Sequence, residues 1–270
     1  ANAHTVFNIT MTLIWVCLIK LMVKIVMTLI PDGKKGVEDP GSPIYLDENI
    51  ISQPAAALQL VAKEIFRMSD QVRDILKKTI ELVKNEEVKS IDGLKENGEQ
   101  VERLGKCITE YLAALFSSGL LTEQQAAQTA SLMCVLSDVE RMGTLSVEMA
   151  ECMLERSDRK YKYTPEAMDE LQKSLKVLNK MFCDSLKALQ GDDGIEPGKM
   201  MKRKDKLLDL DIKMRKAHIE RVNKGKCKAS LTAPFTNILH LIDRMGNSCI
   251  NLADVAESGT SMKYFMLEEK

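Results

Sequence analysis

Apolar residues recur at helical spacing along most of the chain. Beyond residue 54 they return every three or four positions, which is the period of one face of an α-helix. The fold class predicted from this pattern is all-α. Six helices are expected, at Pro54–Asn85, Gly93–Ser117, Thr122–Arg156, Thr164–Gln190, a charged stretch that ends at Asn223, and Pro234–Glu257.

Several of the expected helix ends carry local signals. Thr122 and Gln125 have the spacing of a capping box, in which each residue satisfies a backbone N–H of the other. Thr164 followed by Pro165 is typical of an N-cap with proline in the first turn. Glycines and a proline within residues 191–198 predict a loop before the charged helix.

A different pattern occupies the N-terminal part of the chain. Residues 6–30 are almost entirely apolar and are long enough to cross a bilayer as a helix. Residues 1–31 are therefore predicted to form a transmembrane helix, and the lysines at 34 and 35 would place its C-terminal side in the cytoplasm. An amphipathic helix lying in the membrane interface is the alternative. Residues 32–45, rich in proline and glycine, are predicted to be a linker.

An internal repeat organises the rest of the chain. Glu140-Arg141-Met142-Gly143 recurs 103 residues later as Asp243-Arg244-Met245-Gly246, and Ala150-Glu151 recurs as Ala253-Asp254 at the same offset. A repeat of this length implies two structural units. We predict a three-helix bundle at 46–160, a second at 161–260, and a tail at 261–270.

The repeated residues suggest two kinds of chemistry. Glycine inside a helix costs about 1 kcal/mol relative to alanine, so Gly143 and Gly246 predict close approach of another helix. Acids on facing bundle helices can bind a metal, which makes Glu140 and Asp243 candidate ligands. The alternative is a structural polar layer in which an arginine and an acid pair across helices without metal.

Composition excludes some functions. The net charge of −1 lacks the one-sided basic excess of a nucleic-acid-binding protein. The seven cysteines are scattered and form no CxxC pair, so a zinc or redox site of that type is not expected. An odd number of unpaired cysteines is typical of a reducing compartment. No catalytic arrangement is evident, so an enzyme is not expected.

Two features of the charged helix have open interpretations. For His218, a surface or capping role is favoured over a metal role. Residues 199–206 are either a solvated helix start or a contact with anionic lipid.

The two motif copies lie near the ends of the two predicted three-helix bundles. In sequence and position they resemble the motifs of the PhoU family, whose members regulate phosphate uptake. The family carries E-x-x-x-D pairs that bind multinuclear metal clusters, so the resemblance implies a divalent metal or iron as cofactor. This chain has Thr144 and Asn247 where the second acid is expected, and Glu148 replaces an asparagine that Asn251 keeps. Neutral oxygen donors bind metal more weakly, and this difference favours the polar layer. The remaining motif positions are Arg141, Gly143, Glu151, Arg244, Gly246 and Asp254.

A second resemblance concerns the start of the chain. Residues 3–8, AHTVFN, followed by an apolar helix, look like the last membrane segment of the bacterial sodium-dependent phosphate cotransporter family, whose members often end in a PhoU-like domain. Glu64-x-x-Arg67 and the stretch His218–Cys227 agree with such a domain. The implied protein is the C-terminal fragment of a sodium-dependent phosphate symporter in the inner or plasma membrane, with the PhoU-like regulatory domain in the cytoplasm.

The partners that follow from this resemblance are the missing N-terminal transport core of the same protein, the membrane, and sodium and phosphate through the full-length protein; a homodimer is also compatible with it. The alternative is a membrane-tethered PhoU-like adaptor that regulates a separate phosphate transport or signalling system. The Q-S-S-S type motif of the transport core is missing here, so these 270 residues alone are not expected to transport phosphate.

Overall fold

The computed structural model describes residues 4–12, 15–16, 18, 39–84, 91–157, 162–191 and 197–257. The chain divides into two compact units, Ala1–Asp39 and Pro40–Lys270. In the first unit residues 4–12 are helical. Most of residues 6–30, the predicted linker as far as residue 38, and the predicted tail lie outside the described residues. Within the part that is described, no helix is both long and apolar enough to cross a bilayer. The transmembrane helix therefore stays a prediction.

The second unit is all-α over its described residues, as predicted. It comprises a 3-10 turn η1 (Glu48–Ile50), α2 (Pro54–Lys84), α3 (Asp92–Ser117), α4 (Glu123–Ser157), α5 (Pro165–Leu189), α6 (Pro197–Asn223), a second 3-10 turn η2 (Ala229–Leu231) and α7 (Thr232–Glu257).

The helix starts follow the predicted capping signals. Ahead of α4, the Thr122 N–H donates to the Gln125 side-chain oxygen at 3.0 Å, and the Gln125 N–H donates to the Thr122 hydroxyl at 3.2 Å, which completes the capping box. The Thr164 hydroxyl accepts from the Ala167 N–H at the start of α5. One boundary differs, because α6 already begins at Pro197, which was expected in the loop. Proline fits the first helical turn, where its missing N–H would have no partner.

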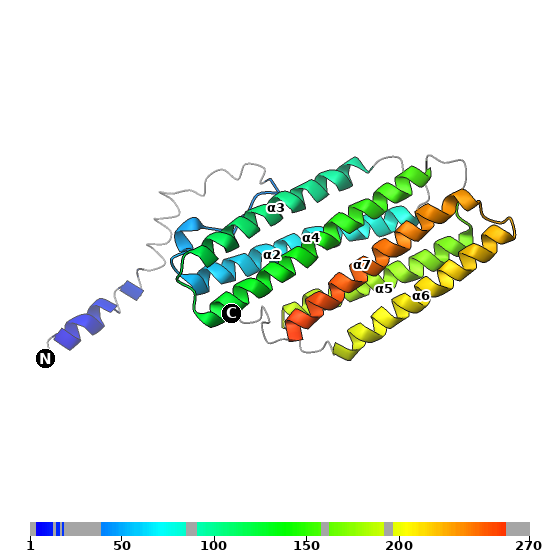
Figure 1. Cartoon of the computed structure of the whole chain (residues 1–270). Helices are drawn as coiled ribbons and strands as arrows, with labels where there is room; N and C mark the ends of the chain where they lie inside the picture. The colour runs from blue at the N-terminus through cyan, green and yellow to red at the C-terminus, as the bar shows by residue number, and fades with distance from the viewer. Residues whose placement is uncertain are drawn as a thin grey trace. The chain divides into compact units, whose positions relative to one another are not determined.

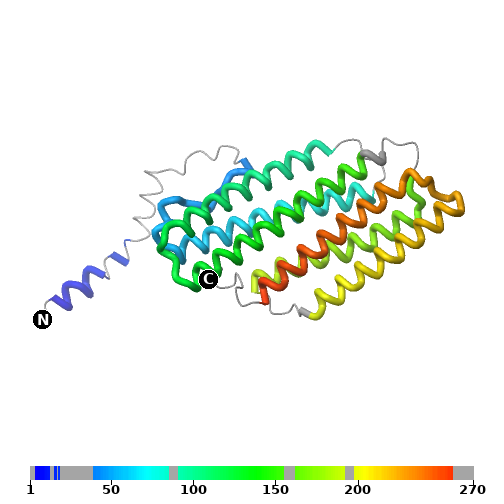
Figure 2. The backbone as a smooth tube through the Cα atoms, in the orientation of Figure 1, coloured from blue at the N-terminus to red at the C-terminus, as the bar shows by residue number. Residues whose placement is uncertain are grey.

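Each half of the repeat forms a set of three helices, and the two sets share one core. Helices α2, α3 and α4 contact one another, as do α5, α6 and α7, while α4 also packs on α7 and α2 on α5 (Figures 1 and 2). The inner group of helices therefore consists of α2, α4, α7 and α5. Helix α3 lies outside this group in the first set, and α6 lies outside it in the second. Because residues from Pro40 onward form one compact unit, the division at residue 160 into two domains remains a prediction.

Residues 40–51, which we call the strap, are fastened to α2 through their backbone. Glu64 of α2 is completely buried, and its carboxylate accepts the N–H groups of Ile44 at 2.9 Å and Tyr45 at 2.7 Å. Arg67, one turn further on, donates to the same carboxylate and to the carbonyl oxygens of Pro40 and Ser42. A buried carboxylate is stable when charged partners and hydrogen bonds satisfy it, and this one has both.

Candidate functional site

The two motif copies meet along the contact between α4 and α7, which we call the α4–α7 interface. The Ser146 hydroxyl lies 3.7 Å from the Met245 sulfur, while the Asn237 amide lies 3.1 Å from the Cys152 sulfur. Residue numbers rise along α4 as they fall along α7, so the two helices run antiparallel. The repeat thus packs its own copies against each other.

Polar residues of the copies also pair across this interface. The Asn251 amide donates to the buried Asp138 carboxylate at 3.2 Å, and Arg244 lies 3.9 Å from Glu148. The second pair is half-exposed, so water screens it and it contributes little. The importance of Asp138 was missed from the sequence, because Leu241 stands at the equivalent place in the second copy and repetition gives no signal there.

The motif glycines have the predicted role of letting helices approach closely. A Cβ on Gly143 would lie 3.3 Å from a Val72 methyl group and 3.4 Å from one of Val101. A Cβ on Gly246 would lie 3.2 Å from a Leu207 methyl group and 3.3 Å from the Lys204 ammonium. Both glycines are buried where an outer helix packs closely on the inner group.

In the first copy, the acid faces α3. Gly105 makes room for the Glu140 carboxyl, since a Cβ there would lie 3.3 Å from its Cδ. Burial, and then the charge of Glu102, raise the pKa of Glu140. No ion pair reaches Glu140 from the described residues.

An acid-rich hollow of about 380 Å³ opens beside Glu140, between α3 and α4; we call it the α3–α4 hollow. The Lys95 ammonium and Glu151 pair at its rim at 2.8 Å. Its lining residues are Lys95, Gly98, Glu99, Glu102, Thr144, Val147, Glu148 and Glu151. Carboxylates therefore outnumber cations around this hollow.

In the second copy, a lysine already binds the acid. The Lys204 ammonium lies 2.5 Å from the Asp243 carboxylate and 3.1 Å from the Asp243 carbonyl oxygen. The residue 103 positions before Lys204 is Val101, which explains why the first copy lacks this ion pair. The two acids of the repeat thus differ because their outer-helix neighbours differ.

This geometry does not fit a metal cluster. Glu140 points toward α3 and Asp243 toward α6, so the two predicted ligands do not face each other. Thr144 donates to the Glu140 carbonyl oxygen and Asn247 to the Asp243 carboxylate, so both positions make bonds within their own helix. Over the described ranges, no three histidine, cysteine or acidic side chains lie close enough together to hold a metal ion. The structure therefore brings the motif together as packing and not as a ligand set.

Part of the chain matches a known protein family. Residues 65–153 match the PhoU domain family. The match covers most of α2, all of α3 and most of α4, and so includes the first motif copy.

Two proteins extend the PhoU likeness. The chain is 24% identical over 209 residues to the phosphate-specific transport system accessory protein PhoU homolog 1 of Thermotoga maritima, covering 76% of this chain and 88% of that protein. Its fold is similar to the crystal structure of PhoU from Pseudomonas aeruginosa, with a TM-score of 0.66 and 13% identity over 73% of this chain and 93% of that one. The predicted PhoU-like fold is confirmed, whereas the symporter part of the prediction stays a prediction.

Among the remaining motif positions, Arg141 and Asp254 are exposed. His218, outside the PhoU match, corrects a prediction. It is buried, its ring stacks on Phe235 with centroids 4.6 Å apart, and its Nε2 lies 3.1 Å from the Thr232 hydroxyl. Burial, and then the charge of Arg221, lower the pKa of His218, which favours the neutral ring. The expected surface role is wrong because Phe235 and Thr232, on the following helix, enclose the ring.

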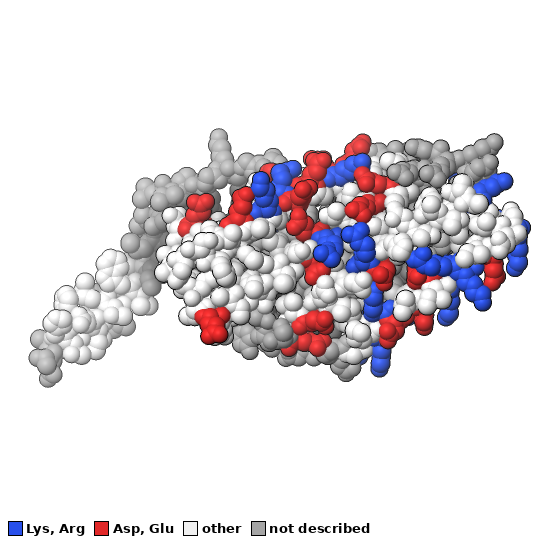
Figure 3. Space-filling view, in the orientation of Figure 1, with Lys and Arg blue, Asp and Glu red and all other residues white. Residues whose placement is uncertain are grey.

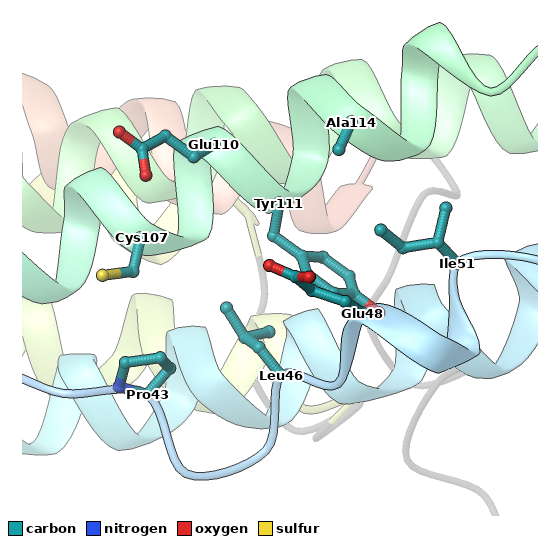
Figure 4. A pocket seen from close by; sticks show the side chains of 8 residues that line it. All are labelled: Pro43, Leu46, Glu48, Ile51, Cys107, Glu110, Tyr111 and Ala114. Carbon is teal, nitrogen blue, oxygen red and sulfur yellow. The ribbon is translucent and has the colours of Figure 1, made fainter.

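A second hollow, of about 470 Å³, lies between the strap and α3 (Figure 4); we call it the strap hollow. It is lined by Pro43, Leu46, Glu48, Ile51, Cys107, Glu110, Tyr111 and Ala114. The Tyr111 hydroxyl donates to the Asp47 carbonyl oxygen at 2.9 Å. Burial raises the pKa of Tyr111, so the hydroxyl keeps the proton it donates.

Proposed function

We propose that the unit from Pro40 onward is a PhoU-type regulatory module of a phosphate transport system. The observation that carries this proposal is the PhoU domain match over residues 65–153, within a fold that is similar to a PhoU structure along most of its length. The name of the Thermotoga relative, an accessory protein of phosphate-specific transport, gives the direction of the proposal.

The geometry favours action by contact with other proteins. Helices α2, α4, α5 and α7 share a closely packed core, and polar pairs join the two motif copies across it. Surface is left on the outer helices, where α3 borders the acid-rich hollow and the strap hollow. A module of this kind can change a transporter by binding it in one state and not in another.

The test compares cells that lack the gene with cells that carry it again. We expect loss of the gene to change phosphate uptake, or the expression of phosphate-responsive genes, as external phosphate is varied. Restoring the intact gene should reverse the change, and a version with Val72→Asp in the core serves as the unfolded control. Uptake and expression that stay the same at every phosphate level would rule out the proposal.

A second candidate is the C-terminal fragment of a sodium-dependent phosphate symporter. The observation that favours it is the apolar stretch of residues 6–30, followed directly by Lys34 and Lys35. The coding sequence upstream of Ala1 separates the candidates: several further hydrophobic spans support the symporter, and an immediate start codon supports a tethered adaptor. Sodium-dependent uptake by the complete protein should then respond to a stop after Pro31.

A further inference from the structure

The strap is joined to α3 at two points, and the strap hollow opens between them. At the first point Arg103 packs on Gly41, where a Cβ would lie 2.9 Å from the guanidinium. At the second point the Tyr111 hydroxyl donates to the Asp47 carbonyl oxygen. Arg103 and Tyr111 are about two helical turns apart, and Cys107 lies midway between them on the same face of α3. The hollow opens around Cys107 and continues along α3 beyond the second point.

Small side chains on α3 give the strap hollow its volume, and the strap gives it apolar walls. Cys107 and Ala114 project from α3, while Pro43, Leu46 and Ile51 project from the strap (Figure 4). Ligand pockets in proteins usually have volumes of about 300–1,000 Å³. At about 470 Å³, this hollow has room for a few inserted side chains, and not for the face of a folded domain. A short, extended segment is therefore the kind of ligand that fits.

Two carboxylates line the strap hollow, one from each side. Glu48 belongs to the strap and Glu110 to α3, and both are exposed. No ion pair reaches Glu48 from the described parts of the chain. The ammonium group of Lys106 lies 4.0 Å from Glu110, but both side chains are mostly exposed, so water screens this pair and it contributes little. The hollow thus offers two carboxylates to a cation, and its lining residues include no lysine or arginine.

The two outer helices differ in charge. Acids outnumber bases on α3, whereas bases outnumber acids on α6. Figure 3 shows this difference on one face of the molecule, where acidic side chains gather along α3 beside some Lys and Arg, and mainly Lys and Arg lie over α6. A positively charged segment is therefore attracted to the helix that borders the strap hollow and repelled by the other outer helix.

The partner named by the proposed function has matching chemistry. A phosphate transporter is a membrane protein, and the cytoplasmic loops of membrane proteins carry an excess of lysine and arginine close to the apolar ends of their spans. Lys34 and Lys35 predict that the module lies on the same, cytoplasmic side. A loop segment of this kind offers a cation to the carboxylates and an apolar side chain to the walls. Anionic lipid and nucleic acid carry the wrong charge for Glu48 and Glu110, and a free polyamine would leave the apolar walls unused.

From these observations we infer that the strap hollow is the docking site for a basic loop segment of the phosphate transporter, which places a lysine or arginine between Glu48 and Glu110 and an apolar side chain against Leu46 and Ile51. This inference rests on the proposed function, from which the class of partner is taken. Because one wall of the hollow is the strap and the other is α3, the bound segment holds the two together. Docking therefore restrains the part of the chain that directly follows the first unit, Ala1–Asp39.

The first test measures binding of short synthetic peptides, which cover the cytoplasmic loops of the organism's phosphate transporters, to the full chain by fluorescence anisotropy. At least one basic peptide should bind, and the double variant E48Q/E110Q should weaken its binding by about tenfold or more. The matched control is E99Q/E102Q, which removes two carboxylates of α3 from the α3–α4 hollow and should weaken binding by less than about threefold. If no peptide binds, or if the two double variants lose the same affinity, the inference is overturned.

Cys107 reports on the strap hollow directly. In the wild type, the bound peptide should slow the labelling of Cys107 by a thiol reagent in proportion to the bound fraction, and should leave the labelling of Cys134 on α4 unchanged. Cys107→Trp should fill the hollow and abolish binding, and the labelling result does not depend on whether this variant folds. Labelling of Cys107 that stays unchanged at saturation would overturn the inference. Spermidine that binds as tightly as the peptide, with the same loss in E48Q/E110Q, would overturn it in favour of a small-cation site.

Phosphate uptake in cells separates this inference from the proposed function. The E48Q/E110Q variant should reproduce a large part of the change in uptake that loss of the gene causes, while E99Q/E102Q should behave as the wild type. If loss of the gene changes uptake and E48Q/E110Q does not, the docking site is wrong and the proposed function stands. If loss of the gene changes neither uptake nor gene expression, the proposed function fails, and the transporter loop fails with it as the occupant of the hollow.

Discussion

Two residues that look equivalent in the repeat differ because each has a different neighbour. Asp243 is neutralised by Lys204, whereas Glu140 is half-buried against Gly105 and near Glu102. The lysine is supplied by α6, at a place where α3 has Val101. A single position in an outer helix thus decides whether the motif acid is part of an ion pair or a carboxylate without a cation.

The first prediction concerns the ion pair. Lys204→Met should lower the free energy of unfolding by about 1 kcal/mol, because Asp243 loses a charged hydrogen bond but remains partly hydrated. Urea unfolding followed by circular dichroism measures the change. Lys213→Met, on the exposed side of the same helix, is the control and should have almost no effect. Equal losses in both variants would contradict a structural role for this pair.

The second prediction concerns pH. Since the folded protein raises the pKa of Glu140, the stability linked to this group is fully present below its unfolded pKa and is lost as pH rises through the folded pKa. Glu140→Gln should therefore be more stable than the wild type at pH 8 but not at pH 4, by less than about 1 kcal/mol because water still screens the group. Unfolding curves at both values test this. Glu102→Gln should reduce the difference, and a difference that does not depend on pH would contradict the prediction.

The third prediction tests the missing acid positions. Thr144→Asp adds a carboxylate to the α3–α4 hollow. A carboxylate near the protein surface attracts a cation with an energy of a few kcal/mol, so the affinity for Mn²⁺ should rise about tenfold or more. Asn247→Asp should give no such gain, because Lys204 already binds Asp243. Isothermal titration calorimetry of both variants decides, and an equal gain in the two would mean that Lys204 does not block the second copy.

At the scale of elements, the strap shows how a segment whose regular structure is a single 3-10 turn is fixed in place. Its fastening residues, Glu64 and Arg67, lie one turn apart on α2, and the strap supplies N–H and carbonyl groups to them. The carboxylate and the guanidinium also bond each other, so neither charge is buried alone.

The fourth prediction follows from this fastening. Glu64→Gln should lower the free energy of unfolding by about 2–3 kcal/mol, because a neutral amide leaves the Arg67 charge without its partner. Hydrogen exchange at the amides of Ile44 and Tyr45 should become faster. Glu48→Gln, an exposed change within the strap, should leave both quantities as they are. Unchanged exchange in E64Q would show that the strap is held by other contacts.

Helix positions could be predicted from the sequence because the signals are local. Capping pairs such as Thr122 and Gln125, and the helical period, act within a few residues, and the bounds agree with the structure within about two residues. The close approach at Gly143 and Gly246 could be predicted as well, but not which side chains pair between helices. The ion pair of Lys204 with Asp243 and the stacking of His218 on Phe235 depend on which faces of separate helices meet, and the period alone does not specify that.

At the scale of the whole molecule, four inner helices join the two sets, and two outer helices each add one buried face to the core and one face to the surface. Each inner helix contacts members of both sets, whereas the main contacts of α3 and α6 are with their own set. Changes in the inner group should therefore affect the entire unit, while changes on the outward faces of α3 and α6 should affect binding.

The fifth prediction uses two cysteines to test whether the inner helices open together. Cys249 of α7 is completely buried, and burial raises its pKa so that the unreactive thiol form persists, whereas Cys134 of α4 is exposed. We expect a thiol reagent to label Cys134 at least about a thousandfold faster, because Cys249 reacts only after the inner helices open. Mass spectrometry of the labelled peptides measures both rates. Comparable rates would mean that α7 opens independently of the rest.

Sequence variation among relatives should differ between the strap and the core. Glu64 and Arg67 hold it by peptide groups, which every amino acid except proline supplies in full, while the side chains of Ser42, Ile44 and Tyr45 remain exposed. The residue types at positions 42, 44 and 45 are therefore free to change between relatives, provided that positions 44 and 45 do not become proline, whereas the two α2 residues that hold them are constrained. Other strap positions are constrained by packing, since Gly41 lies against Arg103, and Leu46, Ile50 and Ile51 pack on the core. A search guided by resemblance within the strap would overlook this element in distant relatives, whereas an acid followed three residues later by arginine, near the start of the first long helix, would find it.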